Sequence, residues 1–338
     1  MAGDHQIFIR RNDPGNLILA PPAGVIQHRI DMRIVVTGAT GFIGRKLLVA
    51  LRAREAHVTV LSRGRAELGD GVDVRQWDPR PGREIAWMEH LDGADAVVHL
   101  AGAGVMDERW TPERLELIRS SRADSTALVA EAIVRAKRPP TVLVSSSAVG
   151  IYGMRSDDRI FDEDGAHGTD VLAKVCEVWE TSAEPARAAG CRVTHPRIGI
   201  ALGKDGGALA KKVPPFRAFV GGPVAPGTQY MSWVHASDVV RALLFAIDEV
   251  ALTGAYNVVA PTPCTSNELA KAIGAVLHRP SALRVPTLAL KLVLGESAKV
   301  LQTGQRCVPK KLLELGFRFE HPSLEEALRS ELSAGSAE

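Results

Sequence analysis

The sequence predicts an α/β fold with a doubly wound parallel sheet of about seven strands and a small, mainly helical C-terminal region. Three observations carry this prediction. A buried-strand pattern at residues 34–36 runs directly into a glycine-rich turn and then a helical pattern. Six further strand patterns follow, alternating with helical ones. After Pro286 the strand patterns end and short helical patterns take over.

The glycine-rich turn has the form of a phosphate-binding loop. Gly38 permits the tight turn, Gly41 lets the backbone approach a diphosphate, and Gly44 lets the helix pack closely on the strand. The helix N-terminus then offers free N–H groups and a partial positive charge. A turn that binds nothing is the alternative, but the order strand, turn, helix favours a dinucleotide. The predicted cofactor contacts here are Gly38, Thr40, Gly41, Phe42, Ile43 and Gly44.

The remaining elements follow in order along the chain. Strands are predicted at 57–61, 72–77, 96–100, 141–144, 192–195 and 255–259. Helices are predicted at 111–137, 170–189, 208–220 and 237–247, with Ser237 as an N-cap, and from Thr265, whose pairing with Glu268 is a capping box. The last short helices are predicted at 288–294, at 310–315 and after Ser323. The predicted domains are an N-terminal extension (1–31), a dinucleotide-binding domain (32–285) with a lid-like insertion (203–229), and a C-terminal helical substrate region (286–332).

The end of the second strand indicates which dinucleotide is bound. NAD-preferring proteins of this fold place a carboxylate there to hold the ribose 2′-hydroxyl. This chain has Ser62 and Arg63, which suit a 2′-phosphate. We therefore predict NADP(H) as the cofactor, although Arg63 can also be a plain surface residue because Arg65 lies close by. Asp78 is predicted to accept a hydrogen bond from the adenine amino group; the alternative is a turn residue before Pro79. The wall of the cofactor site is predicted at Leu100, Ala101 and Gly102.

A serine cluster follows the fifth strand, at the edge where open α/β sheets bind ligands. Ser147 is predicted to donate to a substrate carbonyl or hydroxyl, and Ser145 to lie beside the nicotinamide. The alternative is that these serines only satisfy backbone groups at the strand end. Pro196 and Arg197, after the sixth strand, are also predicted to contact the cofactor. Arg119 and Arg122, three residues apart on a helix, predict a solvated face, with a ligand role as the less favoured alternative.

Composition excludes several classes of protein. The chain has 338 residues, and Lys+Arg (41) nearly balance Asp+Glu (39), so no nucleic-acid surface is expected. The four cysteines form no metal-binding pattern, which predicts no metal site and a reducing cytoplasm. No apolar run reaches the length of a bilayer span, and residues 1–31 lack the features of a signal peptide. We expect a small-molecule substrate, no membrane partner, and a monomer or homodimer.

Together these motifs resemble the atypical short-chain dehydrogenase/reductases of the nucleoside-diphosphate-sugar epimerase-like family. The resemblance covers about 32–332, including a tail similar to that family's C-terminal domain of unknown function. It implies a Rossmann-type fold and hydride transfer with a nicotinamide cofactor. The residues that carry it are 37–44, 62–63, 99–103, 118–122, 145–153, 179–180, 231–235 and 304–306.

The chain departs from active short-chain dehydrogenases at one motif. Those enzymes carry Tyr-x-x-x-Lys, in which Tyr transfers the proton and Lys lowers its pKa and holds the nicotinamide ribose. No Tyr in this chain has Lys four residues later, and the aligned positions are Leu172 and Cys176. Tyr152 and Cys176 are the candidate replacement proton donors; a packed aromatic and an inert buried thiol are the alternatives.

Two functions follow from this pattern. One is an NADP(H)-dependent oxidoreductase or epimerase-like enzyme acting on a small or nucleotide-linked substrate, with Ser147 polarising the carbonyl. The other is a non-catalytic NADP(H) sensor or scaffold. The intact glycine turn and serine cluster favour the enzyme, and the missing Tyr and Lys favour the sensor.

Overall fold

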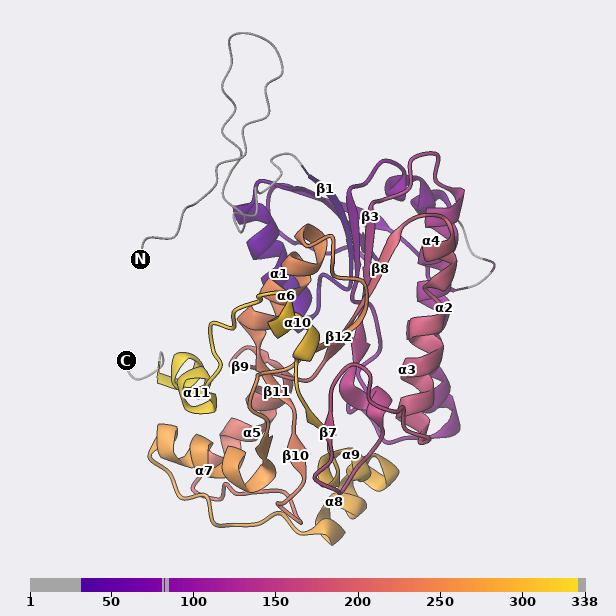
Figure 1. Cartoon of the computed structure of the whole chain (residues 1–338). Helices are drawn as coiled ribbons and strands as arrows, with labels where there is room; N and C mark the ends of the chain where they lie inside the picture. The colour runs from indigo at the N-terminus through magenta and orange to yellow at the C-terminus, as the bar shows by residue number, and fades with distance from the viewer. Residues whose placement is uncertain (1–31, 81, 83–84, 334–338) are drawn as a thin grey trace, which may run out of the picture.

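The computed structural model describes residues 32–80, 82 and 85–333, so the predicted N-terminal extension lies outside the described residues. Its centre is a parallel sheet with the strand order β3-β2-β1-β4-β5-β8-β12 (Figure 1). β2 and β3 lie on one side of β1, and the later strands lie on its other side. The carboxyl ends of β1 and β4 therefore flank the crevice where such sheets bind ligands. The predicted fold class is confirmed. The strands are β1 (Arg33–Thr37), β2 (His57–Ser62), β3 (Val72–Gln76), β4 (Ala96–His99), β5 (Val142–Ser145), β8 (Arg192–Ile198) and β12 (Gly254–Val258).

Helices cover both faces of this sheet (Figure 1). They are α1 (Phe42–Ala53) and α6 (Ala236–Asp248) on one face, and α2 (Pro112–Arg135), α3 (Val171–Thr181), α4 (Glu184–Ala188) and the 3₁₀ helix η1 (Ala86–Leu91) on the other. Successive residues of β1 enter different cores. Ile34 and Val36 pack with α1 and α6, whereas Val35 packs with α2, α4 and η1. Burial on both faces is why this strand is a continuous apolar run in the sequence.

Two predicted helix boundaries are wrong for local reasons. The helix predicted at 170–189 is divided into α3 and α4, because Pro185 in the first turn of α4 has no N–H with which to continue α3. The N-cap of α6 is His235 and not Ser237; the His235 Nδ1 accepts a hydrogen bond from the Ser237 N–H at 3.2 Å. The capping box of Thr265 and Glu268 is confirmed.

The predicted lid-like insertion, 203–229, contains one helix, α5 (Gly207–Arg217). Its buried residues Leu209, Val213 and Phe216 pack with α7 (Ser266–Leu277) and α11 (Leu324–Leu332) in a third core. The role of a lid stays a prediction. The short elements around it are β9 (Ile200–Gly203), β10 (Tyr230–Met231), β11 (Trp233–His235) and β13 (Cys264–Thr265).

The C-terminal region is mainly helical, as predicted. It contains α8 (Thr287–Leu294), η3 (Gly295–Ala298), α9 (Lys299–Gln302), β14 (Arg306–Cys307), α10 (Lys310–Glu314) and α11. β14 pairs with β7 (Ile160–Phe161). Leu312 joins the core under α6, and Leu328 joins the third core, so the region is anchored at two places. The domain boundaries at 285 and 286 stay predictions. Within the described ranges, none of the helices has the length and apolar character needed to cross a membrane.

Asp238 fastens the C-terminal region to α6. Its fully buried carboxylate accepts from the backbone N–H groups of Glu320 (2.8 Å) and His321 (2.9 Å) and pairs with Arg241 (3.0 Å). Asp238→Ala removes both acceptors and is expected to lower the free energy of unfolding by about 2–4 kcal/mol. Asp238→Asn keeps one oxygen and is expected to lose less. Urea denaturation of the two variants checks this, and equal midpoints for wild type and Asp238→Ala would contradict it.

Candidate functional site

The turn between β1 and α1 is shaped by its glycines. Gly38 has a φ of 71°, and the Gly41 N–H donates to the Gly38 carbonyl at 3.0 Å. A Cβ on Gly38 would lie 2.6 Å from the Leu100 carbonyl carbon, so β4 approaches this turn as closely as backbone allows. Among the described residues no side chain caps the N-terminus of α1, whose N-cap is Gly41. Its N–H groups are therefore available to an anion.

A cavity of about 370 Å³ opens at this turn, and we call it the turn cavity. It lies at the carboxyl ends of β1, β2 and β4, where the sequence predicts the dinucleotide. Its lining contains eight of the predicted cofactor residues: Gly38, Thr40, Gly41, Ser62, Arg63, Leu100, Ala101 and Gly102. The sheet topology thus brings together segments that lie more than 60 residues apart in sequence.

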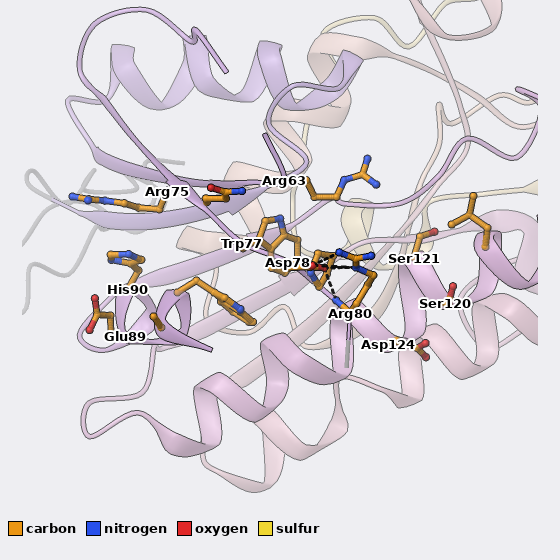
Figure 2. A pocket seen from close by; sticks show the side chains of 15 residues that line it. Arg63, Arg75, Trp77, Asp78, Arg80, Glu89, His90, Ser120, Ser121 and Asp124 are labelled. Atoms are coloured by element: carbon orange, nitrogen blue, oxygen red, sulfur yellow. Dashed lines mark hydrogen bonds and ion pairs between the residues drawn. The ribbon is translucent and has the colours of Figure 1, made fainter. Parts of the chain in front are cut away.

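A second cavity of about 870 Å³, the outer cavity, shares four lining residues with the turn cavity: Arg63, Trp77, Pro79 and Ser121. Figure 2 shows Asp78 and Arg80 paired in the middle of the outer cavity, with Arg63 above them. The Arg80 Nε lies 2.8 Å and 3.0 Å from the two Asp78 carboxylate oxygens. Asp78 therefore lines the cavity where an adenine is predicted, but its carboxylate already binds an arginine.

Three residues of the predicted fingerprint do not line these two cavities. The Phe42 ring packs against Gly203 and Gly206, since a Cβ on either glycine would lie 2.6 Å from a ring atom. Ile43 packs against the core shared by α1 and α6. Gly44 lies against the Gly38 carbonyl, where it fixes the distance between helix and turn.

A buried polar chain, missed at the sequence level, holds the end of β4. The Thr37 Oγ1 lies 2.7 Å from His99 Nδ1, and His99 Nε2 lies 3.1 Å from the Ser125 Oγ. Thr37 Oγ1 also accepts from the Ala101 N–H at 3.3 Å. Burial lowers the pKa of His99 to about 4, so the ring is neutral near pH 7. The chain positions the wall of the turn cavity without adding charge to it.

Ser147 belongs to a buried ionic network. It is 2% exposed, and its Oγ donates to Glu180 Oε1 at 2.6 Å. Arg197 binds the same carboxylate through two nitrogens, both at 2.9 Å. Burial favours a higher pKa for Glu180, but the hydrogen bonds and charge of Arg197 outweigh it and lower the pKa below its ordinary value. Both the Ser147 hydroxyl and the Arg197 guanidinium thus face Glu180, and neither residue lines the turn cavity or the outer cavity. Their roles toward substrate and cofactor stay predictions.

The family assignment rests on comparisons with known proteins. The sequence model of the NAD dependent epimerase/dehydratase family matches residues 34–259. The chain belongs to the NAD dependent epimerase/dehydratase family. Residues 285–331 match a domain of unknown function, DUF1731, which agrees with the resemblance of the tail.

Relatives of this epimerase/dehydratase-family chain cover nearly its whole length. A chloroplastic homologue of epimerase family protein SDR39U1 from Arabidopsis thaliana is 42% identical over 310 residues, covering 90% of this chain and 88% of that protein. Epimerase family protein YfhF from Bacillus subtilis is 35% identical over 299 residues, covering 88% and 97%. The crystal structure of human epimerase family protein SDR39U1 with NADPH superposes with a TM-score of 0.80 at 31% identity, covering 89% of this chain and 99% of that one.

The candidate proton donors of this family member are both buried. Tyr152, at the end of η2 (Val149–Tyr152), donates to Asn257 Oδ1 at 2.8 Å and accepts from Arg197 at 3.0 Å. Burial raises the pKa of Tyr152 above its ordinary value, and it raises the pKa of Cys176 to about 12. Neither side chain lines the turn cavity or the outer cavity. This geometry favours a structural role for both over the predicted proton transfer.

Two other predicted contacts lie at the sheet's carboxyl edge. Ser145 ends β5, is fully buried, and its Oγ has no hydrogen-bond partner among the described residues. Pro196 is buried within β8 opposite Tyr256. Neither lines the two cavities. The described residues include no group of three or more His, Cys, Asp or Glu that could hold a metal.

Proposed function

We propose that the chain binds NADP(H) in the turn cavity and the outer cavity and acts as an oxidoreductase or epimerase-like enzyme on a small or nucleotide-linked substrate. The assignment of NADP(H) rests on the pair Ser62 and Arg63 at the end of β2. Both line the turn cavity, and Arg63 also lines the outer cavity. None of the residues that line the turn cavity is Asp or Glu, the residue type that would hold a ribose 2′-hydroxyl.

Charge pairing supports Arg63 over its neighbours as the phosphate ligand. Arg75 and Arg80 also line the outer cavity, but they pair with Asp73 at 2.9 Å and with Asp78. Arg63 has no ion pair with any described residue, so its fork of donors is available for a 2′-phosphate. The homologous human protein was crystallised with NADPH, which agrees with this choice.

The glycine turn fits the diphosphate of the same cofactor. Gly38 and Gly41 line the turn cavity, and the uncapped N-terminus of α1 supplies N–H donors beside them. When bound, NADP(H) supplies the hydride donor or acceptor. With its diphosphate at the glycine turn, the cofactor would extend its nicotinamide half toward the carboxyl ends of β4 and β5.

The contacts of Ser147 indicate how it can act on a substrate. Its proton is directed at Glu180, and its Oγ lone pairs can accept a hydrogen bond from a substrate hydroxyl. Because its pKa is lowered, Glu180 is ionised near pH 7 and is a weak base there. We therefore assign Ser147 to orienting a hydroxyl-bearing substrate.

A non-catalytic NADP(H) sensor or scaffold is the second candidate. It is favoured by the burial of Tyr152 and Cys176 and by the lack of any Tyr-x-x-x-Lys in the sequence. If the protein turns over any carbonyl or hydroxyl substrate and consumes NADPH or NADP⁺, the catalytic function is correct and the sensor or scaffold is excluded. The cytoplasmic location, the monomeric or homodimeric state and the absence of nucleic-acid or membrane partners stay proposals.

Calorimetric titration with NADPH, NADP⁺, NADH and NAD⁺ tests the cofactor assignment. Wild type is expected to bind NADPH more tightly than NADH. Arg63→Ala is expected to weaken NADPH binding by about 1.5–3 kcal/mol, roughly ten- to a hundredfold, because it removes a charge-assisted phosphate contact. Arg65→Ala is the matched control, since Arg65 is exposed and lines neither cavity. Equal affinity for NADH and NADPH in wild type would refute the 2′-phosphate assignment.

A further inference from the structure

Arg122, in the middle of α2, is a half-buried arginine without a carboxylate partner among the described residues. The only hydrogen bond of its guanidinium to a described residue goes from Nη1 to the Ile118 carbonyl of the same helix, at 3.0 Å. Arg119, three residues earlier, is bound by both Glu116 (2.6 Å) and Asp124 (3.0 Å). Both arginines are partly exposed, but only Arg119 is paired with carboxylates, so the charge of Arg122 is the less compensated of the two.

The Arg122 guanidinium lies near Trp179 of α3 and near Gly102, a residue of the turn-cavity lining, although Arg122 itself lines neither cavity. Its central carbon is 5.1 Å from the centroid of the Trp179 ring, a cation–π contact. A Cβ on Gly102 would lie 3.2 Å from the same carbon. Gly102 lines the turn cavity, as does Ser121, whose Oγ accepts from the Ala103 N–H at 3.0 Å.

The same guanidinium contacts Trp179, one helical turn after the position where the Tyr-x-x-x-Lys motif would place its lysine. Cys176 aligns with that lysine and precedes Trp179 by three residues on α3, so both project from neighbouring turns of one helix face. Cys176 and Arg122 are close enough to interact electrostatically. Burial lowers the pKa of Arg122, because the charged guanidinium loses hydration that no carboxylate among the described residues replaces.

We propose that Arg122 supplies the cation missing at Cys176 and binds the nicotinamide-ribose half of NADP(H) with its guanidinium donors. This inference rests on the proposed function, because it assigns a residue to the cofactor. A planar guanidinium offers several donors in fixed directions, so it can hold ribose hydroxyls or the adjacent phosphate while stacked on Trp179. The stacking against Trp179 and Gly102 preorganises these donors.

Cofactor fragments separate Arg122 from Arg63. NADPH and adenosine 2′,5′-bisphosphate, which lacks the nicotinamide and its ribose, are titrated into wild type and into Arg122→Met, Arg122→Lys, Arg119→Ala and Arg63→Ala. Methionine keeps an apolar stem against Trp179 and removes the donors. We expect Arg122→Met to weaken NADPH binding by about tenfold or more and to change binding of the bisphosphate by less than about twofold. Arg122→Lys retains the charge and is expected to recover part of the affinity.

The controls make each outcome decisive. Arg119→Ala, on the same helix, is expected to bind both ligands like wild type, whereas Arg63→Ala weakens both. Unchanged NADPH affinity in Arg122→Met would overturn the inference. If turnover fell while NADPH affinity stayed unchanged, Arg122 would be assigned to an anionic substrate, and the inference would be overturned as well. The inference would also be overturned if Arg122→Met weakened the binding of both ligands equally, or if Arg122→Met and Arg122→Lys both had a lowered melting temperature. Either result would mean that Arg122 serves only in packing. A wild type that binds neither ligand would instead refute the proposed function itself.

Discussion

Glu180→Ala is expected to lower the free energy of unfolding by about 3–5 kcal/mol. The Arg197 side chain is 5% exposed and the Glu180 side chain 13%, so removing the carboxylate leaves a buried guanidinium without its counter-ion. The Ser147 hydroxyl loses its acceptor in the same step. Chemical denaturation measures the change. Glu131→Ala is the matched control, since Glu131 forms an exposed ion pair with Arg135 and its loss is expected to cost less than about 1 kcal/mol.

The double variant Glu180→Leu with Arg197→Met separates the pair's own contribution from the cost of an orphaned charge. Replacing both partners of a buried ion pair by apolar residues is often close to neutral. We expect the double variant to be more stable than Glu180→Ala. If Glu180→Ala unfolded at the wild-type denaturant concentration, the network would have no structural role.

The pH dependence of this loss has a definite sign. The pKa of Glu180 is lower in the folded protein than its ordinary value, which is about 4.3 in an unfolded chain. The stabilisation is therefore fully present above that ordinary value and is lost as the pH falls through the lower, folded value. The difference in stability between wild type and Glu180→Ala is expected to be constant from pH 6 to 8 and to shrink below about pH 4.

The sheet and the phosphate turn could be predicted from the sequence because their signals are local. Doubly buried strands are continuous apolar runs, and the glycines at 38, 41 and 44 stand directly between a strand and a helix. The position of Ser62 and Arg63 at the end of the second strand followed from the same logic. Eight predicted cofactor residues line one cavity for this reason.

The partners of buried polar side chains could not be predicted in the same way. Glu180 and Arg197 lie on α3 and β8, and their contact depends on how that helix packs on that strand. Both Glu180 and Arg122 stand in motifs that carried the family resemblance, but spacing alone could not identify the side chains that contact them. The ending of α3 near Ser182 likewise depends on a turn and a proline that interrupt an otherwise continuous apolar pattern.

Gly44→Ala is expected to destabilise the fold and to abolish most NADPH binding, although alanine is the better helix former by about 1 kcal/mol. A Cβ on Gly44 would lie 2.3 Å from the Gly38 carbonyl oxygen and 2.6 Å from the Ala39 Cα. Both atoms belong to the backbone, so no side chain can rotate out of the way. The helix must shift away from the turn, at a cost of about 1–3 kcal/mol or more, which outweighs the gain in propensity.

The same shift moves the N–H groups of α1 away from the position where they would bind a diphosphate. Denaturation and NADPH calorimetry on one preparation of Gly44→Ala therefore measure two consequences of a single steric overlap. Gly64→Ala is the control for stability, since a Cβ there would meet no atom within 4 Å, and its effect is expected to stay within about 0.5 kcal/mol. A Gly44→Ala protein with wild-type stability and wild-type NADPH affinity would mean that α1 can move at little cost, and that the close contact of Gly44 with the turn does not set the geometry of the phosphate site.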